Sequence, residues 1–237
     1  MTTIASNLQA VRDAMAAAAI EAGRAPDDVS LLAVSKTFAS EAIREAYRAG
    51  QTRFAESYAQ EALRKIAALP DLPIEWHYIG PIQANKTRAI AEHFAWVHSV
   101  DRLKIAERLS GQRPAHLPPL QVCLQVNISN EASKSGVPPD EAAQLASEVA
   151  QLPHLSLRGL MAIPAPSNDA AVQRAAFARL RELRGQLNRQ GLQLDTLSMG
   201  MSHDFAAAIA EGATMVRVGS AIFGKRDYPQ DGLSNNP

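Results

Sequence analysis

Leu31-Leu32-Ala33-Val34-Ser35-Lys36-Thr37 is the stretch of this sequence that is most typical of a buried β-strand. Side chains alternate between the two faces of a strand, so Leu32, Val34 and Lys36 share one face. A lysine on an apolar face is costly to keep charged, and a neutral amine then becomes available. Such an amine forms Schiff bases with carbonyl compounds. The alternative is a lysine that reaches solvent from the end of the strand.

Other short apolar segments follow this one, and segments with helical periodicity lie between them. We expect strands at residues 31–36, 53–56, 75–80, 96–100, 120–128, 157–163, 196–200 and 215–219. We expect helices at residues 40–49, 57–67, 85–93, 102–109, 140–152 and 169–189. This repeated strand–helix alternation predicts an α/β fold whose parallel sheet closes as a single (β/α)8 TIM-type barrel.

Two segments are expected to lie outside the regular repeat. Ile4, Leu8, Val11 and Met15 recur at helical spacing, which predicts an extra amphipathic N-terminal helix. The stretch 229–237 is polar and rich in turn residues, so we assign residues 1–228 to the barrel domain and 229–237 to a flexible C-terminal tail. An open doubly wound sheet is the competing architecture. It normally has a Gly-rich phosphate loop after the first strand, and Ser35-Lys36-Thr37-Phe38 is not one.

Composition narrows the class of protein. Of the 237 residues, 46% are hydrophobic and 20% are charged, which is typical of a chain with a sizeable core. The 24 basic and 24 acidic residues cancel, so the net charge favours neither nucleic acid nor a membrane surface as a partner. The single cysteine, Cys123, excludes an internal disulfide, and its apolar neighbours predict a buried thiol. We expect no metal site, signal peptide or transmembrane segment, and we predict a cytoplasmic monomer.

Side chains that can do chemistry collect near the ends of the predicted strands, where the active sites of barrels form. They are Lys36, Ser57, His77, Asn127, Met161, Ser198 and Arg217. Random surface polarity would not sort in this way, so the pattern favours a functional site over a lysine that merely reaches solvent.

The last two strands predict a phosphate cup. Loops after the seventh and eighth strands of a barrel often hold a phosphate. Gly200 and Gly219 would let backbone amides approach closely, and Ser202 and Ser220 would add hydroxyl donors. The alternative is that these glycines only make tight turns.

Arg217 is the second telling residue. Val216 and Val218 share the opposite face of its strand, so Arg217 points into the barrel if the valines pack under the helices. A buried arginine stays charged and needs a partner. A ring nitrogen of a cofactor is one candidate, and a carboxylate such as Glu56 is the other.

Six segments are together similar to those of a known family. They are Ala33-Val34-Ser35-Lys36-Thr37, Phe54-Ala55-Glu56-Ser57-Tyr58, His77-Tyr78-Ile79-Gly80-Pro81-Ile82-Gln83-Ala84-Asn85-Lys86, Gly159-Leu160-Met161-Ala162-Ile163-Pro164, Ser198-Met199-Gly200-Met201-Ser202 and Arg217-Val218-Gly219-Ser220-Ala221-Ile222-Phe223-Gly224. The chain resembles the pyridoxal phosphate homeostasis proteins, which are single-domain relatives of the barrel domain of alanine racemase. The resemblance extends over residues 4–228, with the motifs in the family's order.

The resemblance implies pyridoxal 5'-phosphate (PLP) as cofactor, bound as a Schiff base to Lys36. It implies a phosphate position around Ser202, Gly219 and Ser220, and a place for Arg217 near the ring nitrogen. An arginine beside that nitrogen keeps the nitrogen unprotonated, because arginine does not give up its own proton. The cofactor is then a weaker electron sink than one paired with an aspartate.

The resemblance also implies that His77 and Met161 line the pocket. The complete set of cofactor-binding residues that we predict is Lys36, Ser57, His77, Met161, Ser198, Gly200, Met201, Ser202, Arg217, Gly219 and Ser220. The family usually has Gly and Asn where this chain has Ala55 and Ser57. Because serine is shorter by an amide group, a water molecule could replace a direct contact from position 57.

The implied role is a carrier or regulator rather than an efficient enzyme. Such a protein would buffer PLP or deliver it to PLP-dependent apo-enzymes, with effects on amino-acid and keto-acid balance. PLP racemases need a second acid–base group opposite the lysine, which in alanine racemase comes from a second domain of a partner subunit. We expect no such domain, because the sequence ends soon after the eighth strand. The alternatives are a weak PLP-dependent amino-acid racemase and a class I aldolase-like Schiff-base enzyme.

Overall fold

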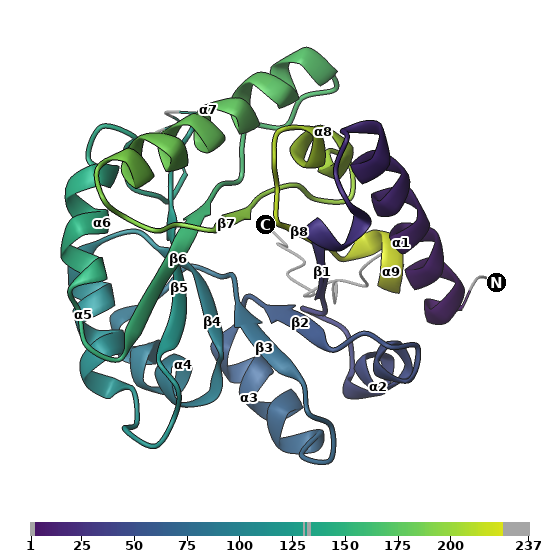
Figure 1. Ribbon diagram of the computed structural model, residues 1–237. Helices are drawn as coiled ribbons and strands as arrows, with labels where there is room; N and C mark the ends of the chain where they lie inside the picture. Colours follow the sequence, from purple (N-terminus) through teal and green to yellow (C-terminus); the bar gives the residue numbers. More distant parts are fainter. Residues whose placement is uncertain (1–2, 130, 132–133, 225–237) are drawn as a thin grey trace, which may run out of the picture.

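The computed structural model describes residues 3–129, 131 and 134–224, and it confirms the predicted barrel. Parallel strands pair in the order β1-β2-β3-β4-β5-β6-β7-β8 and close on themselves (Figure 1). Their bounds are β1 Ser30–Val34, β2 Arg53–Glu56, β3 Glu75–Tyr78, β4 Trp96–Val100, β5 Leu120–Gln125, β6 Leu155–Met161, β7 Thr196–Ser198 and β8 Met215–Val218. The predicted tail, residues 229–237, lies outside the described residues.

Helices surround the strands (Figure 1). Their bounds are α1 Ile4–Glu21, α2 Ser40–Arg48, α3 Ala59–Ala68, α4 Thr87–His93, α5 Leu103–Gln112, α6 Ala142–Ala150, α7 Ala170–Arg189, α8 Phe205–Ala210 and α9 Ser220–Phe223. Two short 3₁₀ helices, η1 Pro26–Asp28 and η2 Ala84–Lys86, precede β1 and α4 respectively. Among the described residues, no helix has both the length and the apolar character needed to span a membrane.

The extra N-terminal helix is also confirmed. Leu8, Val11, Met15 and Ala19 form the buried face of α1, which packs against α2, α8 and α9. Thr3 caps this helix, because its side chain accepts a hydrogen bond from the Ser6 backbone N–H. The helix therefore covers the outside of the barrel where the first and last strands meet.

Several strands end earlier than predicted, and this is a systematic difference. β1 ends at Val34, two residues before Lys36, although the Ser35 N–H still donates to the Ala55 carbonyl at 3.0 Å. β7 and β8 likewise end at Ser198 and Val218. The residues after these ends leave the sheet to form the loops at the carboxyl end of the barrel, so the predicted site residues lie partly on loops.

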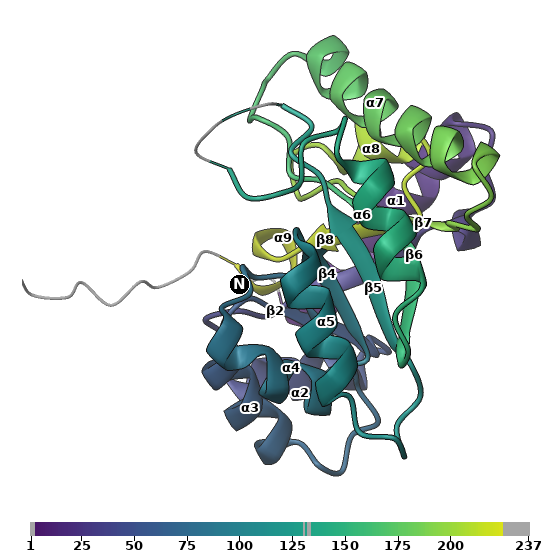
Figure 2. The ribbon, with the colours of Figure 1, turned by 90° about the vertical axis from the view of Figure 1, so that its left-hand side faces the viewer.

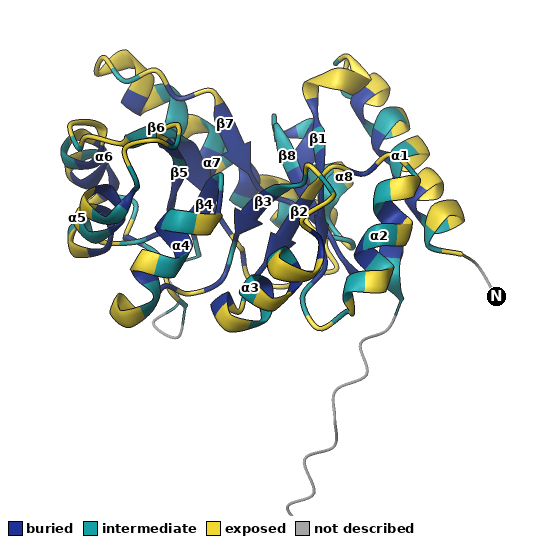
Figure 3. Cartoon of the chain, turned by 90° about the horizontal axis from the view of Figure 1, so that it is seen from below, coloured by how far each residue is buried: buried dark blue, intermediate teal, exposed yellow. Residues whose placement is uncertain are grey.

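The two faces of the strands pack in different layers. Val216 and Val218 belong to the large apolar cluster between strands and helices, as predicted. Trp96, Cys123 and Met161 form a separate cluster, with Met215 packed against it. Since Met215 alternates with the two valines, this second cluster lies in the barrel interior. Figure 3 shows the strands buried and the outward faces of the helices exposed.

A buried ion pair supports the loop that follows β1. Glu56 is fully buried and accepts hydrogen bonds from Lys65 Nζ at 2.7 Å and from Ser35 Oγ at 2.6 Å. Lys65 Nζ also donates to the Ser35 carbonyl at 2.8 Å and to Glu61 at 2.6 Å. Burial raises the pKa of Glu56, and the charge and hydrogen bond of Lys65 oppose that rise. The pair therefore ties α3 to the end of β1.

Replacing Lys65 by methionine should destabilise the fold strongly. Lys65→Met leaves the Glu56 carboxylate buried without its cation, and we expect a loss of about 3 kcal/mol in the free energy of unfolding. The double variant Lys65→Met/Glu56→Gln should recover part of that loss, because no charge is left buried. Urea denaturation measures the free energy of unfolding of the single and the double variant.

The control for this pair is Arg44→Met, which breaks the exposed ion pair with Asp71. We expect this variant to unfold at the wild-type urea concentration, because exposed ion pairs contribute little. Equal losses in Lys65→Met and Arg44→Met would contradict the account of the buried pair.

Candidate cofactor site

The pairing of β1 with β8 brings the first predicted site residue close to the last ones. Leu32 lies opposite Arg217 in this pairing. Lys36 comes two residues after the end of β1 and is half-buried. Gly219 and Ser220 directly follow β8, and α9, which begins at Ser220, lies at one end of the barrel beside β8 (Figure 2). The Lys36 turn and the start of α9 thus follow adjacent parallel strands at the same end of the barrel.

The turn that carries Lys36 is held in place by its neighbours. Thr37 has a φ of 70°, in the left-handed region that a β-branched residue seldom adopts. Its backbone N–H donates to the Glu61 carboxylate at 2.6 Å, and the Phe38 N–H donates to the Ser35 carbonyl at 3.1 Å. Because Glu61 also binds the buried Lys65, the conformation of this turn depends on α3 as well as on the turn itself.

Arg217 lies inside the barrel, as predicted, and is only 3% exposed. Its Nη1 donates to the Ser198 carbonyl at 2.6 Å and to Ser198 Oγ at 2.8 Å, and its Nη2 donates to the Ala162 carbonyl at 3.0 Å. Burial lowers the pKa of Arg217 to about 10, so the guanidinium is still protonated at neutral pH. A guanidinium has five N–H donors, and donors therefore remain for a ligand.

Glu56 is not the partner of Arg217, so that alternative is wrong. Phe54, which shares a face with Glu56, packs in the outer cluster. Ala55 alternates with both and packs with Val34 in a separate cluster. Glu56 therefore points out of the barrel toward α3, where it meets Lys65. Strand alternation, applied to the second strand as it was to the eighth, would have excluded it.

The polar groups that approach Arg217 form a chain of hydrogen bonds across the barrel. Ser198 Oγ lies 2.8 Å from His98 Nδ1, and His98 Nε2 lies 2.9 Å from His77 Nδ1. His77 Nε2 lies 2.9 Å from Glu75 Oε1. The sequence predictions missed His98 and Glu75. His98 lies two residues after the interior Trp96, so strand alternation was the available signal for its position.

The two histidines in this series of hydrogen bonds, His77 and His98, are neutral at neutral pH. Burial lowers the pKa of His77, although the adjacent Glu75 carboxylate opposes the shift. Burial lowers the pKa of His98 well below its ordinary value, and the charge of Arg217 acts in the same direction. The hydrogen bond from His77 lowers the pKa of Glu75, which therefore carries its charge at neutral pH.

The residues of the predicted phosphate cup come together at the end of the barrel. Ser202 Oγ and Ser220 Oγ lie 3.4 Å apart, although their loops follow different strands. Gly200 has a φ of 92°, and a Cβ there would lie 2.6 Å from the Ala208 Cβ. Gly200 therefore lets the loop after β7 pass close to α8. Gly219 is buried, whereas Ser220 is exposed.

The remaining predicted residues divide between the interior and the rim. His77, Met161 and Ser198 are fully buried. Ser57 is half-buried after the end of β2, and Met201 is 38% exposed. A Cβ on Gly80 would lie 2.0 Å from the Ser57 carbonyl oxygen, so the loop after β3 packs directly against the segment that carries Ser57.

This arrangement fits a small ligand with three different groups. Lys36 offers an amine at the rim, Ser202 and Ser220 offer hydroxyl donors for an anion, and Arg217 offers guanidinium donors from within the barrel. PLP has a carbonyl carbon, a phosphate and a ring nitrogen, and this donor set matches it. In the described ranges of the chain, no three His, Cys, Asp or Glu side chains are grouped so that they could hold a metal ion.

The chain is similar to known proteins over nearly its whole length. The family model described as the alanine racemase N-terminal domain matches residues 3–227. The pyridoxal phosphate homeostasis protein of Pseudomonas aeruginosa is 64% identical over 228 residues, which cover 96% of this chain and 98% of that protein. The protein of the same name from Escherichia coli K12 is 53% identical over 231 residues, which cover 96% and 99%.

Solved structures agree with the fold. PipY of Synechococcus elongatus, in the structure described as having PLP bound, has a TM-score of 0.83 and 40% identity. The match covers 94% of this chain and all of that one. Alanine racemase from Corynebacterium glutamicum has a TM-score of 0.67 and 19% identity, and this chain covers 65% of its length. At that identity the likeness supports the fold alone.

A family model matches nearly the whole chain, and relatives that are matched over nearly their whole length are 53% and 64% identical. The chain therefore belongs to the pyridoxal phosphate homeostasis protein family, whose barrel is the alanine racemase N-terminal domain.

Proposed function

We propose that this protein binds PLP as a Schiff base on Lys36 and acts in PLP homeostasis, buffering the cofactor or delivering it to PLP-dependent apo-enzymes. The observation that carries the proposal is the position of Lys36 beside the strand of the buried Arg217. The family's name and the PLP-bound structure of PipY support the same cofactor. We further propose that the protein is a cytoplasmic monomer that influences amino-acid and keto-acid balance.

Each group of residues has a separate task in this proposal. Lys36 supplies the amine that reacts with the carbonyl carbon. Ser202, Gly219 and Ser220 hold the phosphate, together with the turn at Gly200. Arg217 donates a hydrogen bond to the ring nitrogen.

Five further residues complete the pocket that we propose. His77, Met161 and Ser198 form its floor, and Met201 and Ser57 border it at the rim. Ser57 acts through a water molecule, because its side chain is short.

We propose a carrier rather than an efficient enzyme because of Arg217. Bound PLP supplies a reactive carbonyl carbon and an electron-withdrawing ring. Arg217 keeps its own proton, so a ring nitrogen beside it stays unprotonated and the withdrawal is weak. The relatives are also named for homeostasis rather than for a reaction. The alternative function is weak racemisation of amino acids, and its support is that alanine racemase has the same fold.

Removal of the Lys36 amine should abolish the covalent link. Purified wild-type protein mixed with PLP should turn yellow, and borohydride should fix the label on the peptide that contains Lys36. Lys36→Ala should show neither effect, while Lys104→Ala, on the exposed face of α5, should behave as wild type. A fixed label in Lys36→Ala, located by peptide mass spectrometry, would contradict the assignment.

Loss of a cup hydroxyl should weaken PLP but not pyridoxal. Ser220→Ala removes one hydrogen bond to a charged group, and we expect roughly tenfold weaker PLP binding in equilibrium dialysis. Pyridoxal lacks the phosphate, so its affinity should not change. Ser147→Ala, on the exposed face of α6, is the matched control. An equal loss for both ligands would place the phosphate elsewhere.

PLP-loaded protein should not sustain racemisation. We expect no steady turnover of L-alanine or other common amino acids in a coupled assay of D-amino acids, with an alanine racemase as the positive control. The physical reason is the weak electron withdrawal imposed by Arg217. Rapid, continuing racemisation that Lys36→Ala abolishes would favour the enzyme over the carrier.

A further inference from the structure

We propose that a relay of hydrogen bonds through the barrel interior positions Arg217 and connects it to the opposite end of the barrel. The relay consists of Arg217, Ser198, His98, His77 and Glu75, in that order. Its effect on the cofactor rests on the function proposed above, whereas its existence in the protein without PLP does not. His98 and Glu75 are positioning residues here, because they act on the cofactor only through Arg217, whereas Ser198 also belongs to the floor of the proposed pocket.

The contacts of the relay are short and continuous. Arg217 Nη1 lies 2.8 Å from Ser198 Oγ, which lies 2.8 Å from His98 Nδ1. The two imidazoles are 2.9 Å apart, from His98 Nε2 to His77 Nδ1, and His77 Nε2 is 2.9 Å from Glu75 Oε1. The three middle residues are fully buried, so water does not compete for these bonds.

The two ends of the relay fix the direction of every hydrogen bond within it. A guanidinium only donates, and an ionised carboxylate only accepts. Ser198 therefore accepts from Arg217 and donates to His98 Nδ1. Each imidazole then carries its proton on Nε2, so that His98 donates to His77 and His77 donates to Glu75. The reverse direction would set a ring lone pair against the Glu75 carboxylate.

Aromatic packing holds the two imidazoles in this geometry. The His77 ring stacks on Trp96 with centroids 5.5 Å apart and an angle of 12° between the planes. The centroid of the His98 ring lies 5.7 Å from that of Trp96. Arg158 lies over the same indole, 5.3 Å from its centroid. Neither histidine can rotate freely, so the relay is a fixed part of the barrel.

The hydrogen bonds of the relay help to stabilise the positive charge of Arg217 inside the barrel. Arg217 meets neutral oxygens directly, and the charge of Asp204 opposes the fall of its pKa. In the relay that we propose, Glu75 adds a second negative charge, which acts through the polarised hydrogen bonds. A chain of hydrogen bonds in a low dielectric strengthens each member. Three N–H groups of the guanidinium are thereby engaged by Ser198 and Ala162, and donors remain for a ligand.

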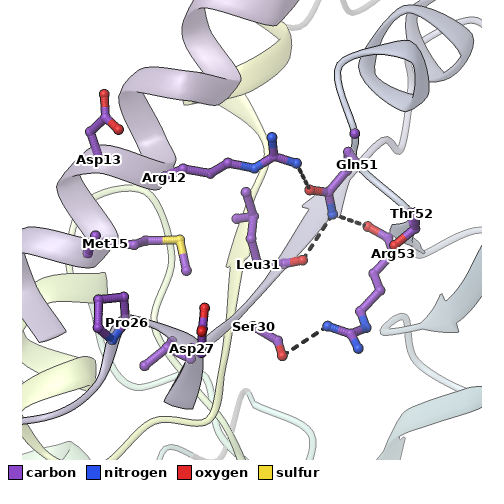
Figure 4. Close-up of a pocket in the computed structure, with 13 residues that line it drawn as sticks. Arg12, Asp13, Met15, Pro26, Asp27, Ser30, Leu31, Gln51, Thr52 and Arg53 are labelled. Atoms are coloured by element: carbon purple, nitrogen blue, oxygen red, sulfur yellow. Dashed lines mark hydrogen bonds between the residues drawn. The ribbon is translucent and has the colours of Figure 1, made fainter.

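The far end of the relay lies near the amino-terminal ends of the strands. Glu75 begins β3, its side chain is 39% exposed, and it also pairs with Arg53 at 3.1 Å. Arg53 donates to Ser30 Oγ at 3.0 Å and borders a cavity of about 450 Å³ that Arg12 and Met15 also line (Figure 4). Loss of the Glu75 charge should therefore reach Arg217 without any change at the rim, whereas Arg53 is not a member of the relay.

The first test uses the protein without PLP. Long-range ¹H–¹⁵N spectra of histidine-labelled protein should show His77 and His98 neutral, with the proton on Nε2, and single-histidine variants would assign the signals. Ser198→Ala removes the hydroxyl but keeps the carbonyl that also holds Arg217. It should shift the signal of His98 Nδ1, which loses its donor, while the proton stays on Nε2, because His77 Nδ1 still accepts from it. A protonated His98, or one with its proton on Nδ1 in the wild type, would overturn the relay.

The second test measures the cofactor. PLP release, followed by absorbance with an excess of trapping apo-enzyme, should be roughly tenfold faster in Ser198→Ala and Glu75→Gln, since groups behind a ligand often have effects of this size. Glu75→Gln keeps an acceptor for His77 and removes only the charge. The matched control, Arg53→Gln, loses the same surface ion pair but keeps the carboxylate, and it should release PLP at the wild-type rate.

The outcomes separate the two proposals. If the wild type takes up no PLP, the proposed function fails while the tautomer measurement still decides whether the relay exists. If PLP binds but Ser198→Ala and Glu75→Gln release it at the wild-type rate, the relay has no effect on Arg217 and this inference fails alone. If Arg53→Gln is as fast as Glu75→Gln, the surface ion pair rather than the relay explains the effect.

Discussion

The backbone pairing between β1 and β8 closes the barrel, and the candidate site depends on it. This pairing sets Leu32 against Arg217, so a strand near the start of the chain and the last strand share one end of the barrel. Lys36 and Ser220 then follow adjacent strand ends. In an open sheet with β1 and β8 at opposite edges, the amine and the phosphate cup would be far apart. Closure is therefore what turns two ordinary strand ends into one site.

Buried charge is handled differently on the two faces of the strands. Outside the barrel, Glu56 and Lys65 form a direct ion pair that fixes the turn after β1. Inside, the hydrogen bonds that Arg217 makes with described residues go to neutral oxygens, and the carboxylate of its hydrogen-bonded chain is that of Glu75, at the far end. A direct carboxylate would occupy the donors of Arg217, whereas the indirect arrangement leaves donors for a ligand. The interior polar residues are thus consistent with a binding role for Arg217.

Alternation and periodicity in the sequence were sufficient to predict most of the fold. Hydrophobic spacing predicted each strand and the helix that begins at Ile4, and alternation around Arg217 predicted its inward direction. The ends of strands were less accurate, because nothing in the alternation of side chains after Val34 and Ser198 marks the point where the backbone leaves the sheet. Such departures depend on loop hydrogen bonds, for example that between the Thr37 N–H and Glu61, which have no signature in a linear pattern.

The positions of single interior residues were predictable from alternation, but the hydrogen-bond network that joins them was not. The predicted set included His77 and Ser198, yet His98, which links them, was missed because contact between distant strands depends on the barrel register. The roles of the predicted residues toward PLP are proposals, and a crystal structure of the PLP-loaded protein tests them most directly. We predict that Lys36 Nζ is bonded to the carbonyl carbon, that Arg217 donates to the ring nitrogen and that Ser202 and Ser220 contact the phosphate. A ring nitrogen turned away from Arg217, or a phosphate outside the cup, would contradict the account.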